Sequence, residues 1–479
     1  MTGKSKLIKD ISANGIQTLV NQVIGLVLFY LSSTYLLKED FGNYNWALAL
    51  SSTVIAIMSF GLDLIVVKRV ASGKQARDVV GMHLFHGMVS GLVALVVLGV
   101  FYVFFKQNKS ESRDLILLPV FVYLVIGNVA NTFKLCLNGL EAYQSLAVVL
   151  VAANLLKLLG VMLLFFVGHF GLEYMLLVYM FGSFAELFLS AWYANRHFDK
   201  AIVPKIRWNA YKGLILEALP QLGVVLFDSA LARIDWILLG VMGTAIATAE
   251  YSFAYRVFEL SKLPLLILSP ILLTRFTKLF GDGNENSLTV EGQVKSYFSL
   301  EMVLVMLIPL VLVHVWTPLV DFITHNKYGA VNEWTYSILA LCIPLHALIN
   351  FLWTLAFVKG FLKPIMWITI VSSLINIGAN VVLIPMYSSQ GAAVSFLFST
   401  LVQSVLYVVL LKRLSLKLRL DGSLLVLGFA LVAYLLGRLV NTSPVVAVVV
   451  SVTVFLLLSV LSKQVDLRKI KSMLMPGKA

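Results

Sequence analysis

Long apolar stretches separated by short polar segments run along almost the whole chain. A helix that crosses the hydrocarbon core of a bilayer, roughly 30 Å thick, needs about 20 mainly apolar residues. Stretches of this length predict about fourteen transmembrane helices. The predicted spans are residues 15–37, 43–66, 80–105, 115–138, 144–168, 172–195, 214–241, 246–273, 297–316, 333–358, 363–386, 390–412, 422–440 and 443–462. The pattern therefore predicts an all-α polytopic membrane protein.

The composition agrees with this pattern and weighs against an enzyme. Of the 479 residues, 59% are hydrophobic and 13% are charged, whereas soluble domains are about one quarter charged. The loops between predicted spans are too short for a soluble catalytic domain. No nucleophile motif, glycine-rich phosphate loop or metal-ligand spacing is present, and His83 and His86 are interpreted as packed or interfacial side chains. We expect no catalytic residue, no metal and no cofactor.

The positive charges are concentrated in alternate loops. If the N-terminus is cytoplasmic, most of the 37 Lys and Arg residues fall in cytoplasmic segments, as the positive-inside rule requires. This asymmetry explains the net charge of +13 without a nucleic-acid partner. It also predicts an even number of crossings, with both termini in the cytoplasm.

Two halves of the chain resemble each other. Short motifs recur at nearly the same spacing: Tyr44 and Ala47 match Tyr251 and Ala254, Gly139 matches Gly360, and Gly171 matches Gly391. A repeat of six helices inserts both copies the same way up. The repeat predicts two pseudo-symmetric six-helix lobes, residues 1–212 and 213–414, followed by a C-terminal helix pair and basic tail in residues 415–479. Two such lobes suit alternating access.

Charged residues occur within several predicted spans. A charge at the centre of a spanning helix costs roughly 2.5–3.5 kcal/mol on insertion scales, so it usually faces a bundle interior or an aqueous cavity. The candidates are Lys157, Asp228, Arg233, Asp235, Arg256, Glu259 and Lys262. Asp228 and Asp235 share a helix face, and Arg256, Glu259 and Lys262 follow i, i+3 spacing. These residues either form salt bridges within the protein or bring at least one basic group to a substrate.

The first predicted helix carries an uncharged polar stripe that includes Asn14, Gln17 and Asn21. Amide side chains suit sugar hydroxyls, but hydrogen bonding between packed helices is an equally good explanation. Pro220, Pro264 and Pro270 predict kinks or breaks in the seventh and eighth helices.

Two segments resemble a known family. The first runs from Tyr35 to Tyr44 (YLLKEDFGNY) and is followed by a long apolar helix that ends in Gly61-Leu62. The second contains Pro220, then 235–240 (DWILLG), then 251–254 (YSFA). Together they resemble the openings of the two lobes of Wzx-type flippases, members of the multidrug/oligosaccharidyl-lipid/polysaccharide (MOP) exporter superfamily.

This resemblance implies a flippase that moves an undecaprenyl-pyrophosphate-linked oligosaccharide, such as an O-antigen repeat unit, from the inner to the outer leaflet by alternating access. It implies a bacterial cytoplasmic (inner) membrane protein whose partners are membrane lipids and, in addition, a glycan polymerase and other polysaccharide assembly proteins. Basic residues are expected to contact the pyrophosphate, and amides the sugar. The substrate-binding candidates are Arg233, Arg256, Lys157, Lys262, Asn21 and Gln17.

A second function is compatible with the same fold. An ion-coupled multidrug exporter of the same superfamily would bind organic cations against the buried acids. Asp228, Asp235 and Glu259 are the candidates for that role or for binding a coupling ion. The four basic residues within spans and the terminal helix pair favour the flippase.

Overall fold

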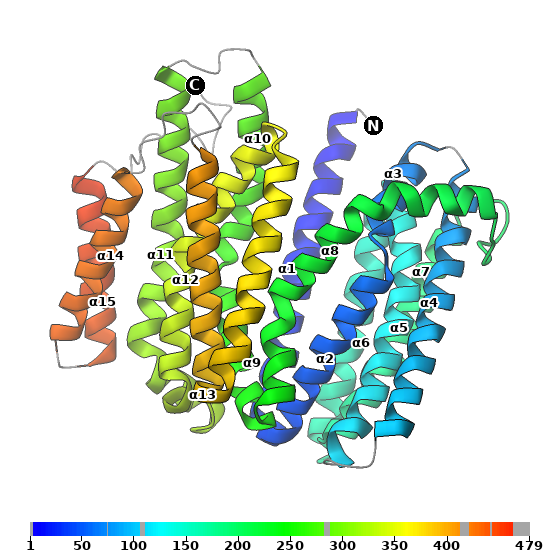
Figure 1. The fold of residues 1–479 in the computed structure, drawn as a ribbon, viewed down its shortest axis with the longest axis horizontal. Coiled ribbons are helices and arrows are strands. Elements are labelled where there is room, and N and C mark those ends of the chain that lie inside the picture. The colour runs from blue at the N-terminus through cyan, green and yellow to red at the C-terminus, as the bar shows by residue number, and fades with distance from the viewer. Residues whose placement is uncertain are drawn as a thin grey trace. The chain divides into compact units, whose positions relative to one another are not determined.

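The computed structural model describes residues 3–73, 75–105, 111–281, 288–411, 421–440 and 443–462 (Figure 1). All regular secondary structure in these residues is helical, which confirms the predicted all-α class. The chain divides into two compact units, Met1–Ala249 and Glu250–Ala479.

The first unit is a bundle of long helices with one broken member. Its elements are α1 (Gly3–Tyr35), α2 (Lys38–Met58), α3 (Leu62–Ala71), α4 (Ala76–Phe105), α5 (Glu111–Gly139), α6 (Tyr143–Phe166), α7 (Leu172–Asn195) and α8 (Trp208–Met242). The beginning of α9 (Ala245–Ser261) completes the unit. Helix α8 first lies across the ends of the neighbouring helices of this unit and then turns to run along α2 (Figure 1).

The prediction of one continuous helix over residues 43–66 is wrong. The structure ends α2 at Met58 and starts α3 at Leu62, with a bend of 52° between them. Phe60 and Gly61 have φ angles of 54° and 69°. Two successive left-handed residues end a right-handed helix, and glycine adopts this conformation without a steric cost. Gly61 is the local sign of the break, but the apolar residues on both sides of it continue the pattern of one span.

Two glycines allow α2 to pack closely against α8 and against the start of α9. A Cβ atom on Gly42 would meet the backbone carbonyl of Ala245, and one on Gly240 would meet the indole ring of Trp46. Small residues permit such backbone approach between membrane helices. Both glycines belong to the segments that resemble the flippase family, and their role here is packing.

The second unit contains two further breaks. Its elements are the rest of α9, then α10 (Leu263–Gly281), α11 (Leu288–Thr324), α12 (Gly329–Val358), α13 (Leu362–Leu411), α14 (Asp421–Leu439) and α15 (Pro444–Leu461). The chain bends by 43° between α9 and α10, next to Pro264, as predicted for this helix. Within α13, Ser388 is not helical, with φ 53° and ψ −127°. It marks the turn that the sequence predicts between residues 386 and 390.

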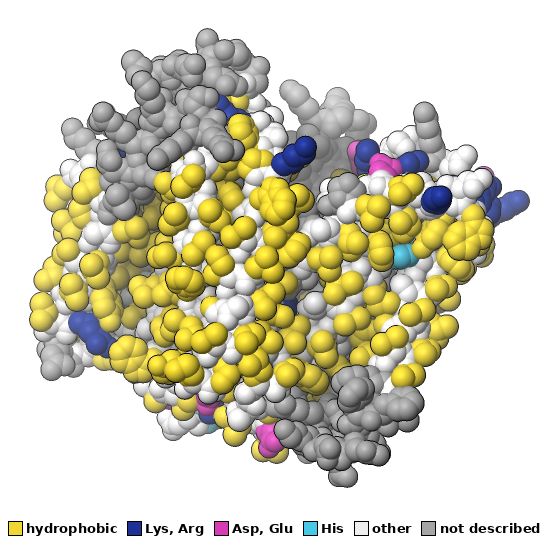
Figure 2. Space-filling view, in the orientation of Figure 1, with side chains coloured by type: hydrophobic (Ala, Val, Ile, Leu, Met, Phe, Trp, Pro, Cys, Tyr) yellow, Lys and Arg dark blue, Asp and Glu magenta, His cyan; other side chains and the backbone are white. Residues whose placement is uncertain are grey.

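The helices carry the surface expected of a membrane protein. Eight of the described helices are long and apolar enough to cross a bilayer, or up to ten if each bent pair is one span. The number fourteen therefore stays a prediction. Large apolar side chains such as Phe181 and Phe188 are 72% and 70% exposed. On the face shown in Figure 2, hydrophobic side chains cover the sides of the helices, and most charged side chains lie near helix ends.

The two units do not coincide with the predicted lobes. Contacts group α8 with the first unit because it packs against α2 and α3, whereas the sequence assigned residues 213–242 to the second lobe. One pair of residues that suggested the repeat lies at helix ends: Gly139 ends α5, and Gly360 directly follows the C-cap of α12. The division into two lobes, 1–212 and 213–414, and a C-terminal helix pair with a basic tail, 415–479, stays a prediction.

Candidate functional site

Three charged side chains from three helices meet inside the first unit. Glu186 of α7 lies 2.6 Å from the Nζ of Lys134 on α5 and 3.2 Å from the Nζ of Lys157 on α6. Each ammonium group donates to a different carboxylate oxygen. The side chains of Lys134, Lys157 and Glu186 are 18%, 15% and 10% exposed. We call these three residues the lysine–glutamate cluster.

The lysine–glutamate cluster depends on close helix packing. Helix α7 packs against both α5 and α6, which brings their side chains within reach of Glu186. Gly182 lies one turn before Glu186, and a Cβ atom there would meet the aliphatic stem of Lys157. Because Gly182 has no side chain, the stem of Lys157 can pass over it and reach Glu186.

The lysine–glutamate cluster has one more positive than negative charge. One carboxylate faces two ammonium groups, and a buried charge without a partner is costly. The excess charge makes this place favourable for an anionic group such as a phosphate. Of the predicted site residues, Lys157 lies here. The sequence pattern does not identify Lys134, because it lies near the predicted cytoplasmic end of its span, where the positive-inside rule already explains a basic residue.

The predicted residues of α8 lie in different environments. The guanidinium of Arg233 lies over the ring of Trp236, 4.5 Å from its centroid. Asp235 is buried, whereas Asp228 is exposed. The two carboxylates are seven residues apart, which is about 10 Å along a helix. They share a helix face but differ in burial.

The predicted residues at the α9–α10 break form local contacts. Arg256 donates to Glu259 at 2.8 Å, the internal pairing that their i, i+3 spacing predicts. The Nζ of Lys262 lies 4.3 Å from the ring centroid of Phe258. These contacts lower the cost of placing the charges in a membrane helix, and they leave open a further contact with substrate.

The amide stripe of α1 contributes one contact to helix packing. The Nδ2 of Asn154 on α6 donates to the Oδ1 of Asn21 at 3.0 Å. Gln17 is partly buried. Asn14 lies in α1, but its side chain is outside the described set.

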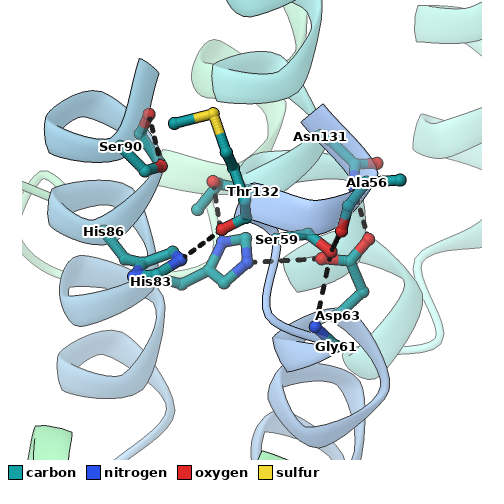
Figure 3. Close-up of polar contacts among 11 residues, drawn as sticks. Ala56, Ser59, Gly61, Asp63, His83, His86, Ser90, Asn131 and Thr132 are labelled. Carbon is teal, nitrogen blue, oxygen red and sulfur yellow. Dashed lines mark hydrogen bonds and ion pairs between the residues drawn. The ribbon is translucent and has the colours of Figure 1, made fainter. Parts of the chain in front are cut away.

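A second polar group surrounds the α2–α3 break (Figure 3). The Nε2 of His86 lies 2.7 Å from the carbonyl oxygen of Met58, and its Nδ1 lies 2.7 Å from the hydroxyl of Tyr211. Because a carbonyl only accepts, Nε2 carries the proton and Nδ1 of the neutral ring accepts from Tyr211. His83 lies 3.4 Å from Asp63 and 2.9 Å from Thr132. Both histidines are buried, so the interpretation as packed side chains is confirmed.

Neither polar group is a metal centre. In the part of the chain that the structure describes, no group of three or more His, Cys, Asp or Glu residues is arranged to hold a metal ion.

Residues 7–274, more than half of the chain, match the family model described as "Polysaccharide biosynthesis protein". The chain belongs to this family. Membership confirms the resemblance to the MOP exporter superfamily and makes the protein a transporter or flippase of that superfamily. None of the curated proteins compared with the sequence is significantly similar to it.

Solved structures with the same fold extend the match over both units. A structure of the lipid II flippase MurJ in an inward closed conformation has a TM-score of 0.73 and 12% identity, covering 94% of this chain and 98% of that one. An inward-facing multidrug resistance MATE family transporter has a TM-score of 0.67 and 15% identity, covering 85% and 98%. A MOP superfamily transporter from Pyrococcus furiosus has a TM-score of 0.60 and 13% identity, covering 85% and 96%. At these identities the likeness concerns the fold, which flippases and exporters share.

Proposed function

We propose that this member of the polysaccharide biosynthesis protein family is a flippase for an undecaprenyl-pyrophosphate-linked oligosaccharide. It moves the glycolipid from the inner to the outer leaflet of a bacterial cytoplasmic membrane by alternating access. The observation that carries the proposal is the excess positive charge of the lysine–glutamate cluster. A pyrophosphate offers several acceptor oxygens to ammonium groups, whereas an organic cation would be repelled.

The other basic candidates of each unit are included in the proposal. Arg233, with its guanidinium over Trp236, and Arg256 and Lys262 at the α9–α10 break are further contacts for the anionic head group. Asn21 and Gln17 are candidates for the sugar. The polyprenyl tail stays in lipid, where exposed apolar side chains surround the helices.

The membrane potential supplies a driving force. Moving a negative head group outward across an inside-negative membrane gains about 2.3 kcal/mol per charge per 100 mV. Both termini are assigned to the cytoplasm by the distribution of Lys and Arg. A glycan polymerase is a suitable partner, because it would consume the flipped repeat unit.

A multidrug exporter is the second candidate, favoured by Asp235, a carboxylate buried on α8. Asp228, Asp235 and Glu259 would then bind organic cations or a coupling ion. The exporter accounts less well for the lysine–glutamate cluster, because that cluster repels a cation.

The experiment uses purified protein in proteoliposomes with two substrates. One is undecaprenyl-pyrophosphate oligosaccharide, followed by the fraction of glycan accessible to an external oxidant, and the other is ethidium, followed by fluorescence. We expect glycolipid movement that accelerates when an imposed potential drives the anion, and no ethidium transport. Ethidium transport without glycolipid movement would overturn the proposal in favour of the exporter.

A further inference from the structure

A buried carboxyl group in the second unit is not explained by the proposed site. Glu301 lies on α11, and the residue is 1% exposed. Its Oε1 accepts a hydrogen bond from the Nδ2 of Asn350 on α12 at 2.7 Å. Its Oε2 is buried and has no hydrogen-bond partner among the described residues. One oxygen of this carboxyl group is therefore held, and the other is left for a ligand.

Glu301 also differs from the buried Glu186 in its charge environment. Glu186 faces two ammonium groups, whereas in the described part of the chain Glu301 forms no ion pair. An isolated ionised carboxylate is very costly away from water, and such a group takes up a proton instead. The neutral acid leaves only a hydroxyl group to satisfy, which costs much less.

The residues around Glu301 favour a proton over a metal cation. In the structure the Nδ2 of Asn350 faces Glu301, and its Oδ1 lies 2.9 Å from the Oγ of Ser269 on α10. A hard metal cation needs oxygen ligands. The atom that Asn350 presents to the carboxyl group is a nitrogen donor, and a donor repels a cation. A proton needs only the free carboxyl oxygen.

Charged and titratable groups on the neighbouring helices have other partners or no contact with Glu301. Helices α10, α12, α14 and α15 pack against α11. Their described groups of this kind include Arg275 on α10, Glu333 and His346 on α12, and Tyr434 and Arg438 on α14. Glu333 pairs with Arg438 at 3.7 Å, and the Nδ1 of His346 donates to the Cys342 carbonyl at 2.9 Å. None of these groups hydrogen-bonds to Glu301 in the described residues.

The carboxyl group of Glu301 is linked to α10, a helix that contains a proline. Ser269 directly precedes Pro270 in α10, and its hydroxyl also contacts the carbonyl of Leu265 at 2.6 Å. Proline removes a helix hydrogen bond and weakens the helix at this point. The contacts of Asn350 with Ser269 and with Glu301 therefore connect the carboxyl group to α10 next to its proline. A movement of α10 away from α11 and α12 would open the surroundings of Glu301 to water.

We propose that Glu301 is a proton-binding site of the second unit. It holds one proton on Oε2 while α10, α11 and α12 are packed as in this structure. When these helices separate and water enters, the acid releases the proton to water and becomes a carboxylate, and no other bond changes. Proton binding does not depend on the proposed flippase function. Its consequence, that transport varies with pH through Glu301, does rest on that function.

The first test needs no substrate. Infrared difference spectra between acid and alkaline pH are recorded for the full-length protein and for Glu301→Gln, which mimics the neutral acid and preserves packing. We expect the wild-type protein to show a protonated-carboxyl band that titrates, and Glu301→Gln to lack it. Glu333→Gln, which removes an exposed carboxyl group of α12, is the control and keeps the band. An unchanged band in Glu301→Gln would overturn the proposal.

Asn350→Ala tests the assignment independently. The amide of Asn350 stabilises the ionised carboxyl group, so its loss should move the midpoint of the band to higher pH by about one unit, a tenfold gain in proton affinity. No shift, or a shift to lower pH, would contradict the geometry described here. A band that responds to sodium rather than to pH would replace the proton by a metal cation.

The predicted pH dependence of transport through Glu301 is tested separately, in the glycolipid assay with the membrane potential clamped. We expect the pH dependence of wild-type flipping to be lost in Glu301→Gln. Unchanged pH dependence in this variant would overturn the role of the proton in transport. If wild-type protein flips no glycolipid while the infrared band behaves as expected, the proposed function fails and the proton site stands.

Discussion

Lys134 and Glu186 lie 2.6 Å apart, joining α5 to α7 in the first unit. Lys157 reaches the other carboxylate oxygen of Glu186 at 3.2 Å. One carboxylate therefore pairs with both lysines. The three side chains together keep one excess positive charge. Removing a lysine should therefore mainly impair transport, whereas removing the glutamate should mainly lower stability.

Replacing one lysine of the lysine–glutamate cluster should impair transport more than stability. In Lys134→Met or Lys157→Met, Glu186 keeps one ammonium partner, but the excess charge is gone. Losing one charged hydrogen bond to the substrate costs about 1.5–3 kcal/mol, so flipping should slow by roughly ten- to a hundredfold. Flipping rates in proteoliposomes and thermal unfolding in detergent measure the two effects.

The matched control for this prediction is Lys359→Met in the second unit. Its Nζ lies 5.0 Å from the ring centroid of Phe280, outside the lysine–glutamate cluster, and flipping should stay near the wild-type rate. Wild-type rates in both Lys134→Met and Lys157→Met would rule out a role for the excess charge.

Replacing the glutamate should destabilise the first unit. Glu186→Gln leaves two partly buried ammonium groups without a carboxylate, and breaking a fully buried ion pair in this way costs about 3–5 kcal/mol, which is the upper bound here. Thermal unfolding of the purified variant should therefore occur at a lower temperature. The double variant Glu186→Gln/Lys134→Met removes one of the unpaired charges and should recover part of the loss. Equal unfolding temperatures for wild type and Glu186→Gln would contradict the ion pairs.

Gly182→Ala tests the path of Lys157 without changing any charge. Because a Cβ atom at position 182 would meet the stem of Lys157, the variant should displace the ammonium group from Glu186 and reduce flipping toward the level of Lys157→Met. Gly127→Ala on α5 is the control, since no atom lies within 4 Å of its added methyl group. A wild-type flipping rate in Gly182→Ala would show that Lys157 reaches Glu186 by another route.

The sequence predicts the helices and part of the candidate site for identifiable reasons. Apolar length alone locates most spans, and i, i+3 spacing predicts the contact between Arg256 and Glu259. The partnership of Lys134 with Glu186 was missed, because it depends on which helices are neighbours, a tertiary property. The break at Gly61 was also missed, since apolar residues continue on both sides of this single glycine and an isolated glycine is tolerated within a helix. Contacts over long sequence separations, rather than local propensity, account for these differences.

Gly42→Ala should destabilise the crossing of α2 over the start of α9. The added methyl group meets the backbone carbonyl of Ala245, which cannot rotate away as a side chain can. Such overpacking costs about 1–3 kcal/mol, although alanine is the better helix former by about 1 kcal/mol. Thermal unfolding in detergent should therefore show a loss for Gly42→Ala and no loss for Gly127→Ala. Equal stability of the two variants would mean that the crossing has room to adjust.

His86→Leu should destabilise the break between α2 and α3. His86 donates to the carbonyl of Met58 at 2.7 Å, and this carbonyl is next to the residues that end the helix. Leaving a buried carbonyl without a donor costs about 1–3 kcal/mol. Tyr211→Phe removes only the hydroxyl that contacts the other ring nitrogen, so its cost should be smaller, near 1 kcal/mol.

Thermal unfolding in detergent measures both variants, with His169→Leu as the control. His169 also contacts a backbone carbonyl, that of Val167 at 3.2 Å, but it is exposed, where water can replace the lost donor. The expected order of destabilisation is His86→Leu, then Tyr211→Phe, then His169→Leu with almost none. A loss in His86→Leu no larger than in His169→Leu would show that the Met58 carbonyl finds another donor. The end of α2 would then be stabilised by its packing and not by His86.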